Sequence, residues 1–189
     1  MMRIVFGVLA GFSAAALAAA SPAHAQQRAA LELHGGINVP TFDIADAAKA
    51  GPSVGGGLAL QLAPKVWLFG EADFGSHGGA DLPGGGTGPD VDVSHFMGKV
   101  GYTVFQSADG KLAFLVNLGA GAMRFKVDGA ESGNTYFAIN AGGKLTYAVA
   151  SRLDLVLSPQ GDIAFTDEDV LGTTNAWVWP VSAGVRVRF

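Results

Sequence analysis

The last fourteen residues of the chain, AWVWPVSAGVRVRF, alternate between two kinds of side chain. One face is apolar and consists of the odd positions Trp177, Trp179, Val181, Ala183, Val185, Val187 and Phe189. The other face carries small and charged residues, among them Ser182, Gly184, Arg186 and Arg188. Period-two alternation is typical of a β-strand and not of a helix. An apolar face opposite a polar one suits a strand with hydrocarbon on its outer side and a packed polar interior on the other.

Seven earlier stretches repeat this alternation and predict seven more strands. They span residues 30–38, 53–62, 66–75, 92–105, 111–127, 137–149 and 153–165. The connections alternate between long loops and short turns, with the short turns near residues 64, 109 and 151. An even number of antiparallel strands joined in this way predicts an all-β fold, an eight-stranded antiparallel up-and-down transmembrane β-barrel.

Two local irregularities interrupt the pattern. Near Arg124 the apolar parity changes, because Phe125 and Val127 take the positions that polar residues would occupy. A β-bulge, or the emergence of the strand from the membrane, would explain this change. Pro180 has no N–H to donate to a ladder, so it predicts a bulge or an unpaired position in the last strand.

The position of the charges distinguishes a membrane barrel from a soluble, lipocalin-like barrel, which would place its apolar face inside. The charged residues of the strands share the face that holds most of the small residues: Glu32, Glu71, Asp73, Lys99, Lys144, Asp154, Asp162, Arg186 and Arg188. A soluble barrel of this polarity would expose its apolar face to water and aggregate. The alternation therefore favours a membrane barrel.

The N-terminus predicts export. Residues 1–25 combine Arg3, an apolar run and an A-x-A site ending at Ala25, which is typical of a secretory signal peptide, and residues 26–189 form the predicted barrel domain. Cysteine is absent, which excludes disulfides and thiolate metal sites. The formal net charge is −4, so we expect no binding to nucleic acid through phosphate neutralisation. The sequence predicts no cofactor and no metal centre.

Charges inside a barrel are expected to be paired. Adjacent strands offer Glu71 with Lys99 and Glu32 with Arg186, and Asp154 has Arg186 or Arg188 as a partner. The predicted interior set is Glu32, Glu71, Lys99, Lys144, Asp154, Arg186 and Arg188. An eight-stranded barrel is only wide enough to be filled by its own side chains, which favours a structural core over a selectivity path.

Two further functions would depend on particular residues of the chain. The acidic Asp167, Glu168 and Asp169 are a weak candidate for a cation that bridges to lipopolysaccharide phosphates, with solvated loops as the alternative. A lipid-modifying hydrolase would need His, Ser and a carboxylate within reach. In Ser76-His77 and Ser94-His95 the neighbours point to opposite faces of a strand, so no supporting motif exists.

The signal peptide, the eight alternating stretches, the segment NAGGKLTYAVASRLDL at 140–155 and the terminal VSAGVRVRF resemble the small outer-membrane β-barrel proteins related to the OmpA and OmpX barrels. This resemblance implies that the last strand is read by the barrel-assembly machinery, with Trp179, Val185, Val187 and Phe189 as the assembly signal. It also implies a place in the outer membrane of a Gram-negative envelope.

The sequence thus predicts a monomeric outer-membrane barrel without catalytic activity, in contact with outer-membrane lipid and lipopolysaccharide. Its expected role is structural or in surface interaction, as in envelope integrity or adhesion. The alternatives are a narrow pore for small solutes and a lipid A-modifying enzyme.

Overall fold

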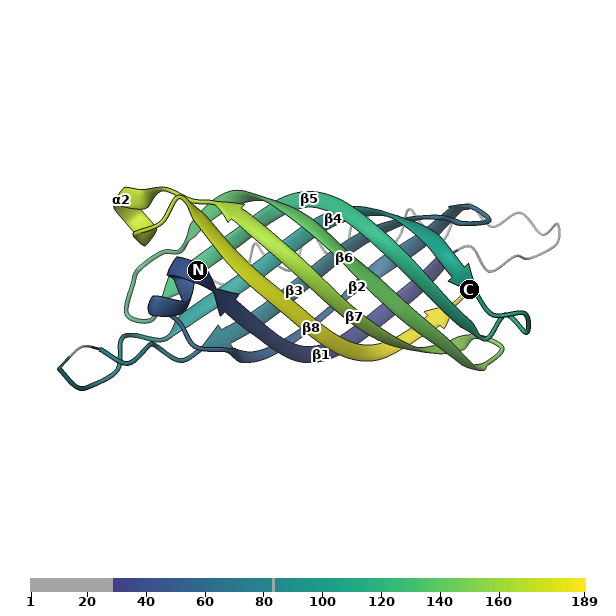
Figure 1. Ribbon diagram of the computed structural model, residues 1–189, viewed down its shortest axis with the longest axis horizontal. Coiled ribbons are helices and arrows are strands. Elements are labelled where there is room, and N and C mark those ends of the chain that lie inside the picture. The colour runs from purple at the N-terminus through teal and green to yellow at the C-terminus, as the bar shows by residue number, and fades with distance from the viewer. Residues whose placement is uncertain (1–28, 83) are drawn as a thin grey trace.

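The computed structural model describes residues 29–82 and 84–189, and the predicted signal peptide lies outside the described residues. Eight strands form a closed barrel in which each strand pairs antiparallel with its sequence neighbours and the last pairs with the first (Figure 1). The strands are β1 (Ala29–Thr41), β2 (Gly51–Ala63), β3 (Val66–His77), β4 (Val91–Gln106), β5 (Leu112–Val127), β6 (Asn134–Ala150), β7 (Leu153–Phe165) and β8 (Asn175–Arg188). The predicted fold is confirmed.

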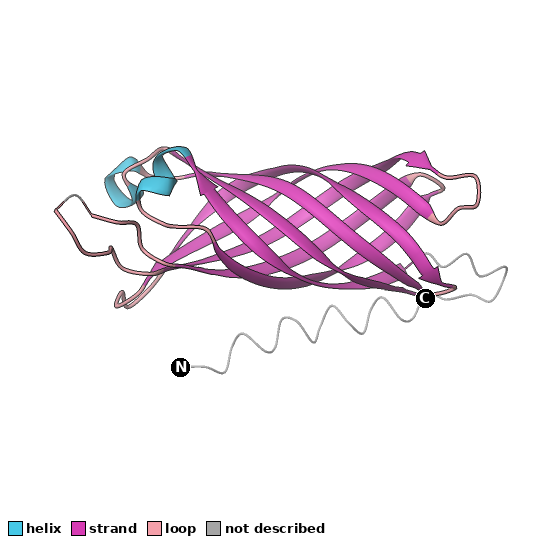
Figure 2. Cartoon of the chain, turned by 60° about the horizontal axis from the view of Figure 1, so that its bottom comes forward, coloured by secondary structure: helices cyan, strands magenta, loops and turns pink. Residues whose placement is uncertain are grey.

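The two ends of the barrel differ (Figure 2). At one end, named here the short-turn end, tight turns join β2 to β3, β4 to β5 and β6 to β7. At the other, the long-loop end, the connections carry the 3-10 helix η1 (Phe42–Asp46) and the short helix α2 (Glu168–Leu171). No helix within residues 29–82 and 84–189 is long and apolar enough to cross a membrane.

Most strands extend one to three residues beyond the predicted limits, because the backbone ladder continues past the end of the alternating pattern.

The pairing also shows how strongly the strands are staggered. Following the pairs from His34 through β2, β3 and β4 leads to Met123 on β5. Following them the other way, through β8, β7 and β6, leads to Ala113. These two positions are ten residues apart, a stagger that corresponds to a strand tilt of about 40°. Side chains at one height inside the barrel are therefore not the ones that pair across neighbouring strands.

The alternation separates an apolar outer wall from a polar interior. Large side chains such as Leu33, Val100 and Leu118 are exposed on the wall, and Leu118 is 70% exposed. The charged strand residues that point outward are Asp92, Arg124 and Lys126, all near the long-loop end.

No bulge occurs at Arg124. The pairing of β5 with β4 and β6 runs through this residue without a register shift, so the bulge that the sequence allowed there is wrong. Arg124 and Lys126 are exposed while Met123 and Phe125 are buried inside. The change of parity marks the part of the strand where apolar residues fill the interior and cations face outward, which fits the alternative that the strand emerges from the membrane here.

Pro180 is unpaired on its β7 side without a bulge, and on its β1 side it pairs with Asn38. The β7–β8 pairing is interrupted between Pro159–Val181 and Asp162–Val178 and resumes in the same register. In this gap Trp179 covers Gly161, where an added β-carbon would lie 2.9 Å from the indole ring. A proline without an N–H thus causes a local loss of ladder pairing, as the sequence predicted.

Candidate functional site

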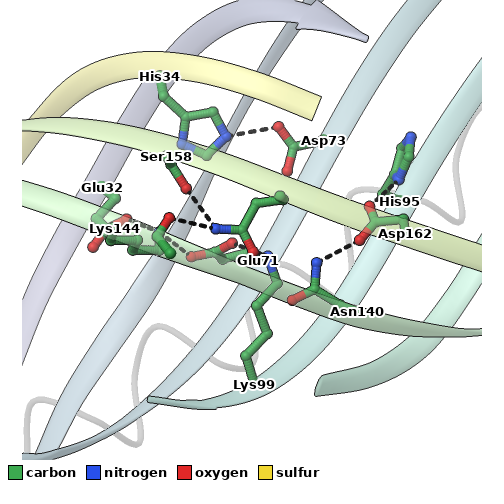
Figure 3. Close-up of polar contacts among 12 residues, drawn as sticks. Glu32, His34, Glu71, Asp73, His95, Lys99, Asn140, Lys144, Ser158 and Asp162 are labelled. Carbon is green, nitrogen blue, oxygen red and sulfur yellow. Dashed lines mark hydrogen bonds and ion pairs between the residues drawn. The ribbon is translucent and has the colours of Figure 1, made fainter. Parts of the chain in front are cut away.

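The centre of the barrel holds a connected group of charged side chains, named here the ion network (Figure 3). Lys99 Nζ lies 2.7 Å from Glu71 Oε2, and Arg186 Nη2 lies 2.5 Å from Glu32 Oε1. Lys144 contacts both carboxylates and joins the two pairs, with its Nζ 2.5 Å from Glu32 Oε2. The network therefore links residues from β1, β3, β4, β6 and β8 across the interior.

Aromatic and amide side chains surround the ion network. Lys144 Nζ lies 5.0 Å from the centre of the Phe69 ring, and the guanidinium of Arg186 lies 5.3 Å from that of Trp67. Gln160 accepts from Lys99 Nζ at 3.3 Å and donates to the backbone oxygen of Gly143 at 2.9 Å. Buried charges require such partners, because each loses its hydration inside the barrel.

A separate ion pair lies nearer the short-turn end. Arg188 Nη2 is 2.9 Å from Asp154 Oδ1, so of the two partners that the sequence offered to Asp154, Arg188 is the one in contact. Arg188 is more exposed than the cations of the ion network. This ion pair therefore lies at the edge of the filled interior that is more exposed to solvent.

Two histidine–carboxylate pairs lie between the ion network and the long-loop end, and the sequence analysis did not predict them. His34 Nε2 lies 2.7 Å from Asp73 Oδ1, and His95 Nδ1 lies 2.6 Å from Asp162 Oδ2. Asn140 donates to the second oxygen of Asp162. The alternation of the strands indicates that all these side chains point inward. Which of them meet depends on the stagger of the strands, so the alternation alone does not predict the pairs.

Apolar side chains close the interior at the long-loop end. Ile44 and Ala48, from the connection after β1, pack in one buried cluster with Val91, Val93 and Phe125. Polar residues thus fill the middle of the barrel and apolar residues its mouth. Among the described residues, these two groups of side chains fill the interior from its middle to its long-loop end, as expected of an eight-stranded barrel.

The four residues of the predicted assembly signal lie in or directly after β8. The side chains of Trp179, Val185, Val187 and Phe189 are exposed on the outer wall. Trp179 Nε1 donates to Thr41 Oγ1 at 3.1 Å, and the backbone N–H of Phe189 donates to the oxygen of Ala29 at 2.8 Å. These contacts join the two ends of the described chain along the β1–β8 seam.

The acidic segment after β7 has a local structural role. Asp167 caps α2, since its carboxylate accepts from the backbone N–H of Asp169 at 3.1 Å. Glu168 and Asp169 lie in the first turn, where carboxylates are favourable. Among residues 29–82 and 84–189, no three His, Cys, Asp or Glu side chains are grouped to hold a metal ion. Cation bridging by Asp167, Glu168 and Asp169 to an external phosphate stays a prediction.

The serine–histidine neighbours do not form a catalytic contact. Ser94 lies on the outer wall and His95 is buried inside, and Ser76 and His77 are separated by the wall in the same way. A serine nucleophile needs its base within hydrogen-bonding distance. These pairs therefore do not supply the chemistry of a hydrolase.

An apolar wall, a closed ring of eight antiparallel strands and a charged, filled interior define an integral β-barrel of the outer-membrane class. The chain belongs to the outer membrane protein β-barrel domain family, whose model matches residues 5–189.

Solved structures show the same fold at low sequence identity. Neisserial surface protein A is 16% identical with a TM-score of 0.67, covering 85% of this chain and 97% of its own. OprG from Pseudomonas aeruginosa is 12% identical with a TM-score of 0.58, covering 86% and 96%. The N-terminal β-barrel domain of Pseudomonas aeruginosa OprF is 16% identical with a TM-score of 0.54, covering 87% and 98%. Among curated proteins, none matches the sequence significantly.

Proposed function

We propose that this protein is a non-catalytic, closed barrel of the outer membrane that serves the envelope as a structural or surface-interaction protein. Export by the N-terminal signal peptide and insertion by the barrel-assembly machinery belong to this proposal. The observation that carries it is the filled interior. The ion network occupies the middle of the barrel, and Ile44 and Ala48 pack into its long-loop mouth. The barrel therefore presents surfaces to lipid and to the exterior and not a channel.

Conductance tests this proposal against the narrow-pore alternative. Protein folded in detergent and kept unheated is inserted into planar lipid bilayers. We expect no stable channel of large conductance, because charged and apolar side chains fill the cross-section. A double variant, Glu71→Ala with Lys144→Ala, removes part of the filling and is expected to conduct more if it still shows the mobility of a folded barrel. Stable large channels from the unchanged protein would contradict the proposal.

Lipopolysaccharide is the proposed surface partner. Arg124 and Lys126 point outward near the long-loop end, and within the described residues neither forms an ion pair. On β6 and β7, the two strands after β5, the rings of Phe137 and Phe165 stack on the outer wall with their centres 6.0 Å apart. In outer-membrane barrels the longer loops are extracellular, and from this rule we infer that these cations lie beside the outer leaflet. Cations at this height attract the phosphates of an anionic lipid.

The amount of lipopolysaccharide that stays bound through purification tests this partner. The double variant Arg124→Gln with Lys126→Gln is compared with Lys111→Gln with Arg152→Gln, which removes the same charge at the short-turn end. We expect the first to retain less lipopolysaccharide through purification and the second to match the unchanged protein. Equal retention by both would refute this contact and leave the closed-barrel proposal standing.

Mass spectrometry of lipid A tests the enzyme alternative. We expect the same lipid A masses from cells with and without the protein, and an altered acylation pattern would support the enzyme alternative.

A further inference from the structure

Three buried polar side chains meet inside the barrel near its long-loop end. They are Asn38 of β1, His77 of β3 and His95 of β4, and each is at most 1% exposed. Each imidazole uses its Nδ1 for a strong contact. His77 Nδ1 lies 2.9 Å from the backbone oxygen of Lys49, and His95 Nδ1 lies 2.6 Å from Asp162 Oδ2. These contacts place the proton on Nδ1 and leave the lone pair on Nε2 of both rings.

The two Nε2 atoms lie beside the Asn38 amide. His95 Nε2 is 3.5 Å from Asn38 Nδ2, longer than an ordinary N–H hydrogen bond. His77 Nε2 is buried without a hydrogen-bond partner, and so is Asn38 Oδ1. A β-carbon at Gly75 would lie 2.5 Å from Asn38 Nδ2 and 3.1 Å from His77 Nε2, so the absence of a side chain at Gly75 lets these two groups approach the same point. A buried polar atom without a partner is costly, and here two neighbouring side chains each carry one.

This arrangement matches the outer contacts of metal-binding histidines, which donate their second nitrogen to a carboxylate or a backbone carbonyl. We propose that His77 and His95 bind a divalent transition-metal ion of the late first row through their Nε2 atoms. Asn38 Oδ1 supplies a third contact after rotation of the amide, and water completes the coordination shell. Imidazole ligands suit Cu²⁺ and Zn²⁺ more than Ca²⁺ or Mg²⁺, and Cu²⁺ should bind most tightly.

The site is separate from the ion network and from the surface role proposed above. Lys49, whose carbonyl orients His77, belongs to the connection between β1 and β2 at the long-loop mouth. Metal binding would tie β1, β3 and β4 together at the end of the barrel where the connections are longest.

Copper titration tests the proposal. The mature chain, prepared without a histidine tag and folded in detergent, is titrated with CuCl₂, and the bound ion is examined by electron paramagnetic resonance. We expect one Cu²⁺ per protein, with hyperfine coupling to two imidazole nitrogens. His77→Gln and His95→Gln should each weaken binding at least tenfold. The matched control is His34→Gln, which removes the third histidine of the mature chain, one engaged with Asp73.

Each outcome decides the proposal. Equal Cu²⁺ binding by the unchanged protein and by His77→Gln or His95→Gln would overturn it, as would loss of binding in His34→Gln. A spectrum without nitrogen coupling in the unchanged protein would overturn it whether or not any variant folds. Folding of each variant is checked by the mobility of unheated samples on a gel. A parallel titration with ZnCl₂ should raise the unfolding temperature of the unchanged protein and of His34→Gln only.

Discussion

Replacing Glu71 with glutamine should destabilise the barrel more than replacing Lys144 with methionine, although Lys144 contacts two carboxylates. The ion network contains the carboxylates of Glu32 and Glu71 and the cations of Lys99, Lys144 and Arg186. Without Lys144, each carboxylate keeps one cation. Without the charge of Glu71, three cations share the single carboxylate of Glu32.

The magnitudes follow from burial. Removing one partner of a buried ion pair costs about 3–5 kcal/mol, because the remaining charge is left without compensation. Glu71→Gln leaves Lys99 in this condition and leaves Lys144 with Glu32 alone, and both lysines are buried, so its cost should fall in this range. Lys144→Met removes charge-assisted hydrogen bonds but creates no unpaired charge, and the methionine can pack against Phe69. Its cost should be about 1–3 kcal/mol.

The assay is reversible urea unfolding from lipid vesicles, followed by tryptophan fluorescence, since Trp177 and Trp179 lie on the outer wall and move from lipid to water. We expect the unfolding free energy to be highest for the unchanged protein, lower for Lys144→Met and lowest for Glu71→Gln. A Lys144→Met variant at least as unstable as Glu71→Gln would refute the idea that unpaired buried charges decide the stability. Glu71→Gln within about 1 kcal/mol of the unchanged protein would show that the network is not energetically coupled.

Three other predictions concern single positions. Deleting Phe189 should reduce insertion into the outer membrane more than it reduces the stability of protein already folded, and normal insertion in cell fractions would contradict this. Gly36→Ala should block closure, because an added β-carbon would lie 2.1 Å from the backbone oxygen of Val181 on β8, whereas Gly70→Ala, with no atom within 4 Å, should fold normally on unheated gels. Arg188→Gln should cost less than Glu71→Gln in the same urea assay, because it removes one ion pair in which Arg188 is 27% exposed, and an equal or larger cost would contradict this.

Most of the architecture could be predicted from the period-two alternation of side chains in the sequence. Because the side-chain period of a strand is two, it identifies which residues share a face, and it placed Glu32, Glu71 and Lys144 inside. The contact of Glu71 with Lys99 was also predicted, because their strands are neighbours, although the register places Glu71 opposite Met97 and makes this contact a diagonal one. The emergence of β5 at Arg124 was one of two alternatives, since a change of parity alone does not distinguish a bulge from an apolar plug.

Contacts across the lumen could not be predicted in this way. Lys144 on β6 meets carboxylates on β1 and β3, and His95 on β4 meets Asp162 on β7. Which side chains share a height depends on the stagger of the whole barrel, a property of all eight pairings together. The packing of Ile44 into the mouth likewise depends on how a loop folds back, for which the sequence carried no periodic signal.

The apolar face of every strand should lie in lipid while the charged face is enclosed. The chain has no cysteine, so single cysteines can be introduced at Val181, Ser182 and Ala183 of β8 and labelled with a fluorophore. In vesicles with a lipid-borne quencher, labels at 181 and 183 should be strongly quenched, whereas Ser182→Cys should resist labelling in the folded protein. Equal labelling and quenching at all three positions, or quenching at 182 alone, would contradict the account.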